Sequence, residues 1–84
     1  MTYSVSIKQS AAKTLEKIAR DDRLRIIEAI DQLATNPAAG GVLKGEYAGL
    51  RRLRVGNYRV VYEVQDRQLR VLVIRIGHRR EVYR

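Results

Sequence analysis

The sequence predicts an α+β fold in which two helices pack on one face of an antiparallel sheet. Apolar residues recur with helical spacing between residues 10 and 36, and apolar and polar residues alternate in the segments on either side. The expected order is an N-terminal strand, a two-helix hairpin and then a three-stranded antiparallel meander. A length of 84 residues suits one domain, spanning residues 1–84.

The first half of the chain should form the strand and the helical hairpin. Residues 2–7 alternate polar and apolar, as in a strand with one buried face. Ser10 is the expected N-cap of the first helix, and Asp21 with Asp22 that of the second. Asn36-Pro37 ends the second helix, because proline restricts the residue before it. The apolar residues expected to face the sheet are Leu15, Ile18 and Ala19, then Ile26 or Ile27, Ile30, Leu33 and Ala34.

The second half should form the meander. Gly56-Asn57 separates two alternating runs, which indicates a hairpin with a two-residue loop. Residues 38–41 are expected to be a short flexible connection and residues 66–68 a second turn. The nearly all-apolar residues 69–76 should form a strand that is covered on both faces or lies in the middle of the sheet. The hairpin register pairs Val55 with Tyr58, Arg54 with Arg59, Leu53 with Val60, and Arg52 with Val61.

That register gathers Arg52, Arg54 and Arg59 on one face of the hairpin, because directly opposed side chains share a face. Like charges opposite each other destabilise a sheet by a few tenths of a kcal/mol. The arrangement is favourable if an anion binds over this face. The alternative is a solvated outer face with splayed arginines, and a register slip of one residue would scatter the three side chains.

The charge of the chain also indicates an anionic partner. The formal net charge is +8. Residues 1–42 contain six basic and five acidic side chains, whereas residues 43–84 contain eleven and four. Ten of the thirteen arginines lie in the second half, and the arginine fork suits phosphate oxygens. A polyanion is the expected partner of that half, and a charge excess kept for solubility is the alternative.

Other site classes are not expected. The chain has no cysteine, which excludes disulfides, thiolate zinc sites and a cysteine nucleophile, and its one histidine is His78. A metal site would need carboxylates, and the nine in the chain are mostly scattered among basic neighbours. We expect no metal and no other cofactor. No apolar run approaches the ~20 residues of a membrane span, and no signal peptide is recognisable. We expect a soluble, cytoplasmic protein without membrane contact.

Residues 77–84 are expected to leave the central strand and to carry further site residues. Histidine is the side chain suited to proton transfer near neutral pH, so His78 is a candidate base, although a lone histidine is more often structural. Tyr83 could stack on an unpaired base or close the edge of the sheet as an apolar clasp.

The chain resembles the RelE/ParE toxin superfamily, most closely its RelE branch. The resemblance covers essentially the whole chain. It is carried by residues 43–45, by residues 50–62 with Gly-x-Tyr-Arg-x-x-Tyr, and by the closing Gly-His-Arg…Tyr of residues 76–83. It implies a toxin of a type II toxin–antitoxin system that cuts mRNA in the ribosomal A site, without metal, through the RNA's own 2′-hydroxyl. It also implies an acidic RelB-like antitoxin that wraps the toxin, and contact with operator DNA only through that complex.

The resemblance assigns roles to individual residues. Arg59 matches the arginine that stabilises the transition-state phosphate, Arg79 the general acid, and Tyr83 the tyrosine that positions the base. Arg52 stands where the family often has a catalytic lysine. With His78 these form the expected catalytic set, and the expected phosphate-binding residues are Lys44, Arg51, Arg54 and Arg80.

Two features leave the assignment open. Leu50 stands where some members of the family have a second lysine. Arg52 is a poor candidate for the general base, because an arginine stays protonated and does not readily accept the proton of the 2′-hydroxyl. Either His78 is the base or the reaction depends on electrostatics alone. The alternatives to the nuclease are a ParE-type toxin that inhibits DNA gyrase without enzymatic activity, and a plain nucleic-acid-binding module.

Overall fold

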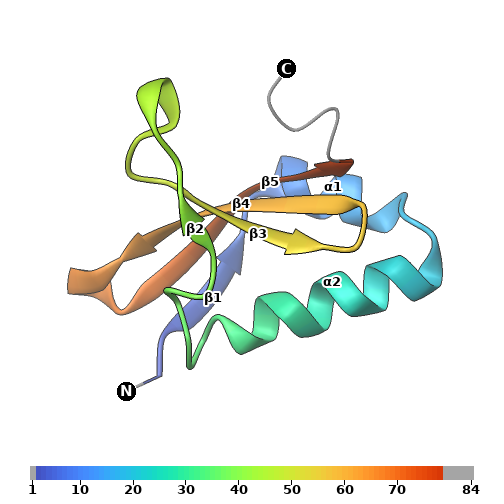
Figure 1. Cartoon of the computed structure of the whole chain (residues 1–84). Helices are drawn as coiled ribbons and strands as arrows, with labels where there is room; N and C mark the ends of the chain where they lie inside the picture. Colours follow the sequence, from blue (N-terminus) through green and yellow to red (C-terminus); the bar gives the residue numbers. More distant parts are fainter. Residues whose placement is uncertain (1, 79–84) are drawn as a thin grey trace.

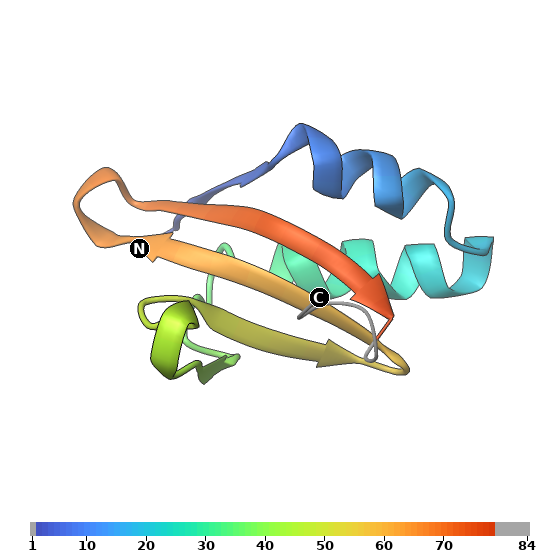
Figure 2. The same cartoon turned by 90° about the horizontal axis from the view of Figure 1, so that it is seen from above.

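The computed structural model describes residues 2–78, in which two helices cover one face of a five-stranded sheet (Figure 1 and Figure 2). The strand order is β1-β5-β4-β3-β2, with β1 parallel to β5 and the other neighbours antiparallel. This confirms the α+β prediction. The elements are β1 (Ser4–Ile7), α1 (Gln9–Glu16), α2 (Arg20–Gln32), β2 (Gly41–Val42), the 3₁₀ turn η1 (Gly45–Tyr47), β3 (Arg51–Val55), β4 (Tyr58–Gln65), the 3₁₀ turn η2 (Asp66–Gln68) and β5 (Arg70–His78).

The helical hairpin forms where predicted, but its ends differ from the expectation. α1 begins one residue before Ser10, with Lys8 at the N-cap and no capping side chain. α2 has Ala19 at its N-cap, so that Ala19 is exposed instead of facing the sheet. Asp21 and Asp22 lie in the first turn of α2, where they complement the helix dipole without capping it.

The sheet is larger than the predicted meander. β1 joins it through a parallel pairing with β5, and β2 adds a two-residue edge strand where a flexible connection was expected. β5 lies between β1 and β4, which confirms its predicted central position. It also continues through Gly77 and His78, two residues that were expected to have left the strand.

The core lies between the helices and one face of the sheet, which we call the helix-covered face. Ile26, rather than Ile27, is the residue of α2 that becomes fully buried. Ala34 is half-buried. The buried apolar cluster consists of Ala11, Leu15, Ile18, Ile26, Ile30 and Leu33 from the helical segment and Val60, Tyr62, Val71, Val73 and Ile76 from the sheet.

The β3–β4 hairpin has the predicted register. Val55 pairs with Tyr58 and Arg54 with Arg59, and Gly56 adopts φ +58°, the left-handed conformation that a tight two-residue loop requires. The register therefore places alternate residues of β3 and β4 on the helix-covered face and on the opposite, outer face.

Tyr62 fastens the segment between α2 and β2 to the sheet. Its side chain is 0% exposed, and its hydroxyl donates to the Pro37 carbonyl oxygen at 2.7 Å and accepts from the Gly40 N–H at 2.9 Å. Arg51 Nη1 donates to the Gly40 carbonyl oxygen at 2.8 Å. A Cβ at Gly40 would lie only 2.5 Å from the Arg52 carbonyl oxygen, so only glycine fits there. We call these contacts the Tyr62 clasp.

Candidate nucleic-acid interface

Four arginines lie close together on the outer face of β3, β4 and β5, and we call them the arginine face: Arg52, Arg54, Arg59 and Arg75. A fifth arginine on the outer face, Arg70, lies away from them at the start of β5, opposite Gln65. They occupy two neighbouring rows across the three strands. One row is Arg54–Arg59–Gly77 and the next is Arg52–Val61–Arg75. Three of these arginines are those that the hairpin register predicted.

The two positions of β4 at the centre of the arginine face are buried. Arg59 is 8% exposed and Val61 is 4% exposed. Arg59 Nη1 donates to the Tyr58 carbonyl oxygen at 3.2 Å, which restrains the guanidinium. A restrained cation away from bulk water attracts an anion more strongly than a solvated one, because the local dielectric constant is lower. Arg54 and Arg75 are exposed and Arg52 is half-buried at the periphery.

The other predicted site residues lie elsewhere. Arg51 is on the helix-covered face opposite Tyr62, where it belongs to the Tyr62 clasp. Lys44 is exposed in the loop that precedes η1. His78 pairs with Tyr58, and the two rings meet edge to face with centroids 5.9 Å apart. Because Tyr58 packs against the core, this register places His78 on the face opposite the arginines. Arg79, Arg80 and Tyr83 lie outside the described residues.

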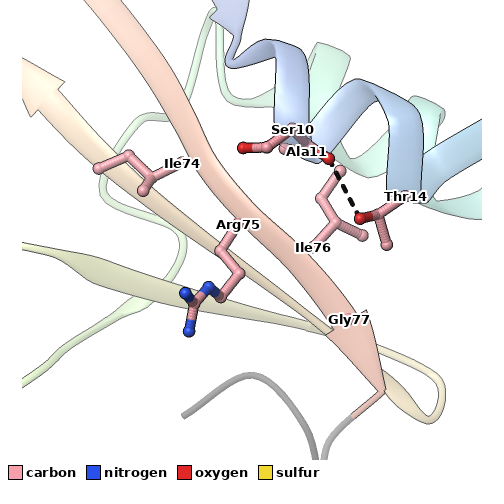
Figure 3. A pocket seen from close by; sticks show the side chains of 7 residues that line it. All are labelled: Ser10, Ala11, Thr14, Ile74, Arg75, Ile76 and Gly77. Atoms are coloured by element: carbon pink, nitrogen blue, oxygen red, sulfur yellow. Dashed lines mark hydrogen bonds between the residues drawn. The ribbon is translucent and has the colours of Figure 1, made fainter. Parts of the chain in front are cut away.

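A hollow of about 280 Å³ lies between α1 and the last part of β5. Its lining residues are Ser10, Ala11, Thr14, Ile74, Arg75, Ile76 and Gly77 (Figure 3). In Figure 3 Ile76 extends toward α1, whereas the Arg75 side chain extends to the other side of β5. The Thr14 hydroxyl is occupied by a hydrogen bond to the Ser10 carbonyl oxygen at 3.1 Å.

Arg75 was not among the residues that the sequence indicated. It stands within the nearly all-apolar stretch 69–76, in which no alternation shows which side chains point outward. Its place follows from an irregularity in the β4–β5 pairing at Val61/Tyr62, which no local sequence signal marked. Within residues 2–78, no group of three or more His, Cys, Asp or Glu side chains could hold a metal ion.

Comparison with known proteins gives a consistent picture. The family model described as the ParE toxin of the type II toxin–antitoxin system parDE matches residues 5–83. Toxin RelG of Mycobacterium tuberculosis is 31% identical over 86 aligned residues, covering 100% of this chain and 99% of that protein. Toxin RelE of the same organism is 34% identical over 84 residues, covering 98% of this chain and 87% of that protein.

Solved structures share the fold over nearly the whole chain. A chain of the toxin–antitoxin complex RelBE2 from Mycobacterium tuberculosis superposes with a TM-score of 0.87 at 28% identity, covering 93% of this chain and 99% of that one. A chain of the archaeal RelE–RelB complex from Pyrococcus horikoshii gives a TM-score of 0.79 at 30% identity, covering 98% of this chain and 100% of that one.

Proposed function

Because the chain belongs to the RelE/ParE superfamily of type II toxin–antitoxin toxins, we propose that it is a ribosome-dependent endoribonuclease that cleaves mRNA in the A site. The observation that supports this most is the arginine face, in which Arg59 is nearly buried, is restrained by its hydrogen bond to the Tyr58 carbonyl oxygen, and lies next to Arg54 and the row that contains Arg52 and Arg75. The similarity to toxins named RelE and RelG supports the same branch of the superfamily.

The chemistry that this face suits is attack of a 2′-hydroxyl on the neighbouring phosphorus. The 2′-oxygen forms a bond to phosphorus, its proton passes to a base, and the P–O5′ bond breaks as the leaving oxygen takes up a proton. The products are a 2′,3′-cyclic phosphate and a 5′-hydroxyl end. Negative charge grows on the phosphoryl oxygens during this step, and the restrained guanidinium of Arg59, together with that of Arg52 on the neighbouring strand, would stabilise it.

The proton carriers of this reaction come from the family resemblance. In the proposed mechanism Arg79 donates the proton to the leaving 5′-oxygen, and Tyr83 stacks on a nucleobase of the mRNA and so holds it in position. The position of His78 beside Tyr58, on the face opposite the arginines, does not favour it as the base. Electrostatic stabilisation by the arginines, with the ribosome orienting the mRNA, is then the larger contribution.

The proposal is tested by adding the purified chain to a reconstituted translation reaction and mapping cuts on the mRNA. We expect cuts in the A-site codon, only when ribosomes are present, with cyclic-phosphate and 5′-hydroxyl ends. Arg59→Gln should lower the single-turnover rate by about 100-fold or more, the typical effect of removing one transition-state donor. Arg25→Gln, at an exposed position of α2, removes the same charge and should leave the rate unchanged. Full activity of Arg59→Gln would refute the site.

A ParE-type toxin acting on DNA gyrase is the second candidate, favoured by the family model that matches residues 5–83. The two activities differ in what an arrested cell loses. The nuclease depletes intact mRNA without DNA damage signalling, whereas gyrase inhibition induces that signalling and leaves mRNA intact. A plain binding module would show salt-dependent RNA affinity and no cuts.

The proposed partner is an acidic antitoxin that wraps the toxin. Structures with high similarity to the chain come from complexes of RelE with RelB, and a cationic toxin of charge +8 attracts an acidic chain electrostatically. Operator DNA would be contacted only through the antitoxin. Co-expression with the neighbouring reading frame should copurify a small acidic protein, and its absence would count against this partner.

A further inference from the structure

The β4–β5 pairing contains a β-bulge whose extra residue is Ile74. Tyr62 pairs with Val73, but the next residue back on β4, Val61, pairs with Arg75. Ile74 therefore has no directly opposed partner. Because side chains alternate along a strand, one extra residue exchanges the two faces for everything that follows.

The first two residues after the bulge suit the exchanged faces. Arg75 is on the outer face and Ile76 is 3% exposed in the core, while Gly77 lies beside Arg59. With uninterrupted pairing, Arg75 would lie opposite Val60 on the helix-covered face, and Ile76 would occupy the outer face next to Arg59. The bulge thus keeps an apolar side chain off the arginine face and adds an arginine to it.

The position of Arg75 on that face suits an extended anion. Arg75 and Arg52 stand on either side of Val61, two strand spacings or about 10 Å apart at the backbone. The row that contains Arg54 and Arg59 lies about 7 Å further along the strands. A single phosphate held at Arg59 would leave Arg75 within reach of a neighbouring phosphate of the same chain, since an arginine side chain is long and flexible. Bulges that re-aim a side chain are frequent next to functional sites.

We propose that Arg75 binds an RNA phosphate that flanks the one at Arg59, and that the bulge at Ile74 exists to deliver it. The inference rests on the proposed function in taking RNA as the anion. It adds a binding residue that the family motif does not include, and it extends the site from the β3–β4 hairpin onto β5.

The experiment measures the affinity of the full chain for a fluorescent single-stranded oligouridylate at several KCl concentrations. One phosphate contact contributes about 0.7 to the slope of log K against log salt for single strands, so Arg75→Gln should reduce the slope by about 0.7. When the KCl concentration rises from about 50 to about 200 mM, the ratio of the wild-type RNA affinity to the variant's RNA affinity should then fall about 2.6-fold. Arg75→Lys keeps the charge and should restore the slope.

Arg25→Gln is the matched control, because it removes one exposed arginine charge from α2, which packs under the other face of the sheet. It should leave the slope unchanged. Urea unfolding of each variant checks that the fold is retained, so that a change in the slope is not a loss of structure. In mRNA cleavage on ribosomes, Arg75→Gln should raise KM and leave kcat within about twofold, whereas Arg59→Gln should lower kcat.

Two outcomes would overturn the inference: no salt-dependent RNA binding by the wild type, or an unchanged slope in Arg75→Gln. An unchanged slope accompanied by weaker antitoxin binding would assign Arg75 to the protein partner. RNA affinity is measured without ribosomes, so absence of cleavage would refute the proposed nuclease while leaving the Arg75 result standing on its own.

Discussion

Replacing Tyr62 by phenylalanine should lower the free energy of unfolding by about 2–3 kcal/mol, although only one oxygen atom is removed. The hydroxyl is fully buried and makes two hydrogen bonds, to the Pro37 carbonyl oxygen at 2.7 Å and from the Gly40 N–H at 2.9 Å. A typical hydrogen bond contributes about 1 kcal/mol net, and a buried donor left without its partner costs about 1–3 kcal/mol. Gly40 is buried, so water cannot replace the lost acceptor.

The assay is urea unfolding followed by circular dichroism. If the slope m is the same for the wild type and the variant, the difference between their midpoints gives the difference in the free energy of unfolding. In a domain of this size, 2–3 kcal/mol corresponds to a fall in Tm of roughly 10–20 °C. Tyr58→Phe is the control, because Tyr58 lies on the same strand and face, and its ring packs against the core and meets the His78 ring edge to face. It should change stability by less than about 0.5 kcal/mol.

The reasoning would be refuted if Tyr62→Phe were no more destabilising than Tyr58→Phe. Hydrogen exchange gives a second measurement. Loss of the Tyr62 clasp should speed exchange of the amides in β2, because the segment that precedes β2 is no longer fastened to β4. Unchanged exchange in β2 would mean that its pairing with β3 holds the segment without the clasp.

Three further substitutions test other parts of the structure. Gly40→Ala should destabilise the fold by more than about 2 kcal/mol in urea unfolding, since its Cβ would lie 2.5 Å from the backbone oxygen of Arg52; a loss below 1 kcal/mol would contradict the packing. The hydrogen bond from Tyr3 to the Asp66 carboxylate raises the pKa of the tyrosine hydroxyl, so its stabilising effect is complete below about pH 10 and lost as the pH rises through the raised value. The stability difference between wild type and Tyr3→Phe should therefore be smaller at about pH 11 than at about pH 8, and an equal difference would refute the link. Arg54→Glu replaces a like-charged cross-strand pair by an opposite one and should raise stability by a few tenths to about 1 kcal/mol while weakening RNA binding; lower stability would show that the arginines do not repel.

The sequence was sufficient for the parts of the fold with strong local signals. The two-residue Gly56-Asn57 loop fixes how many residues separate β3 from β4, and the pairing of Arg54 with Arg59 follows directly. The core residues of α2 and its C-cap follow from helical periodicity, since Ile30 and the C-cap Leu33 are buried at the predicted spacing.

What the sequence did not reveal depends on contacts between distant segments. The two-residue strand β2 has no periodicity of its own and forms only because β3 offers a free edge. In an apolar run such as residues 69–76, no polar residue marks where the alternation shifts, so the bulge at Ile74 and the outward direction of Arg75 could not be inferred. The place of His78 beside Tyr58 follows from the same shift.

The domain has two layers, and within residues 2–78 both α-helices, α1 and α2, lie on the helix-covered face and not on the outer face. A macromolecule that binds the outer face of the folded protein, and does not bind the unfolded chain, raises the free energy of unfolding by mass action. The increase is about 2.7 kcal/mol at a concentration of 100 times its Kd. That increment is a large part of the 5–15 kcal/mol that holds an ordinary domain together. The lifetime of the protein against proteases should therefore depend on which partner is bound to the outer face. Unfolding of the isolated chain gives the stability without a partner, which is the lower limit of the stability of the bound protein.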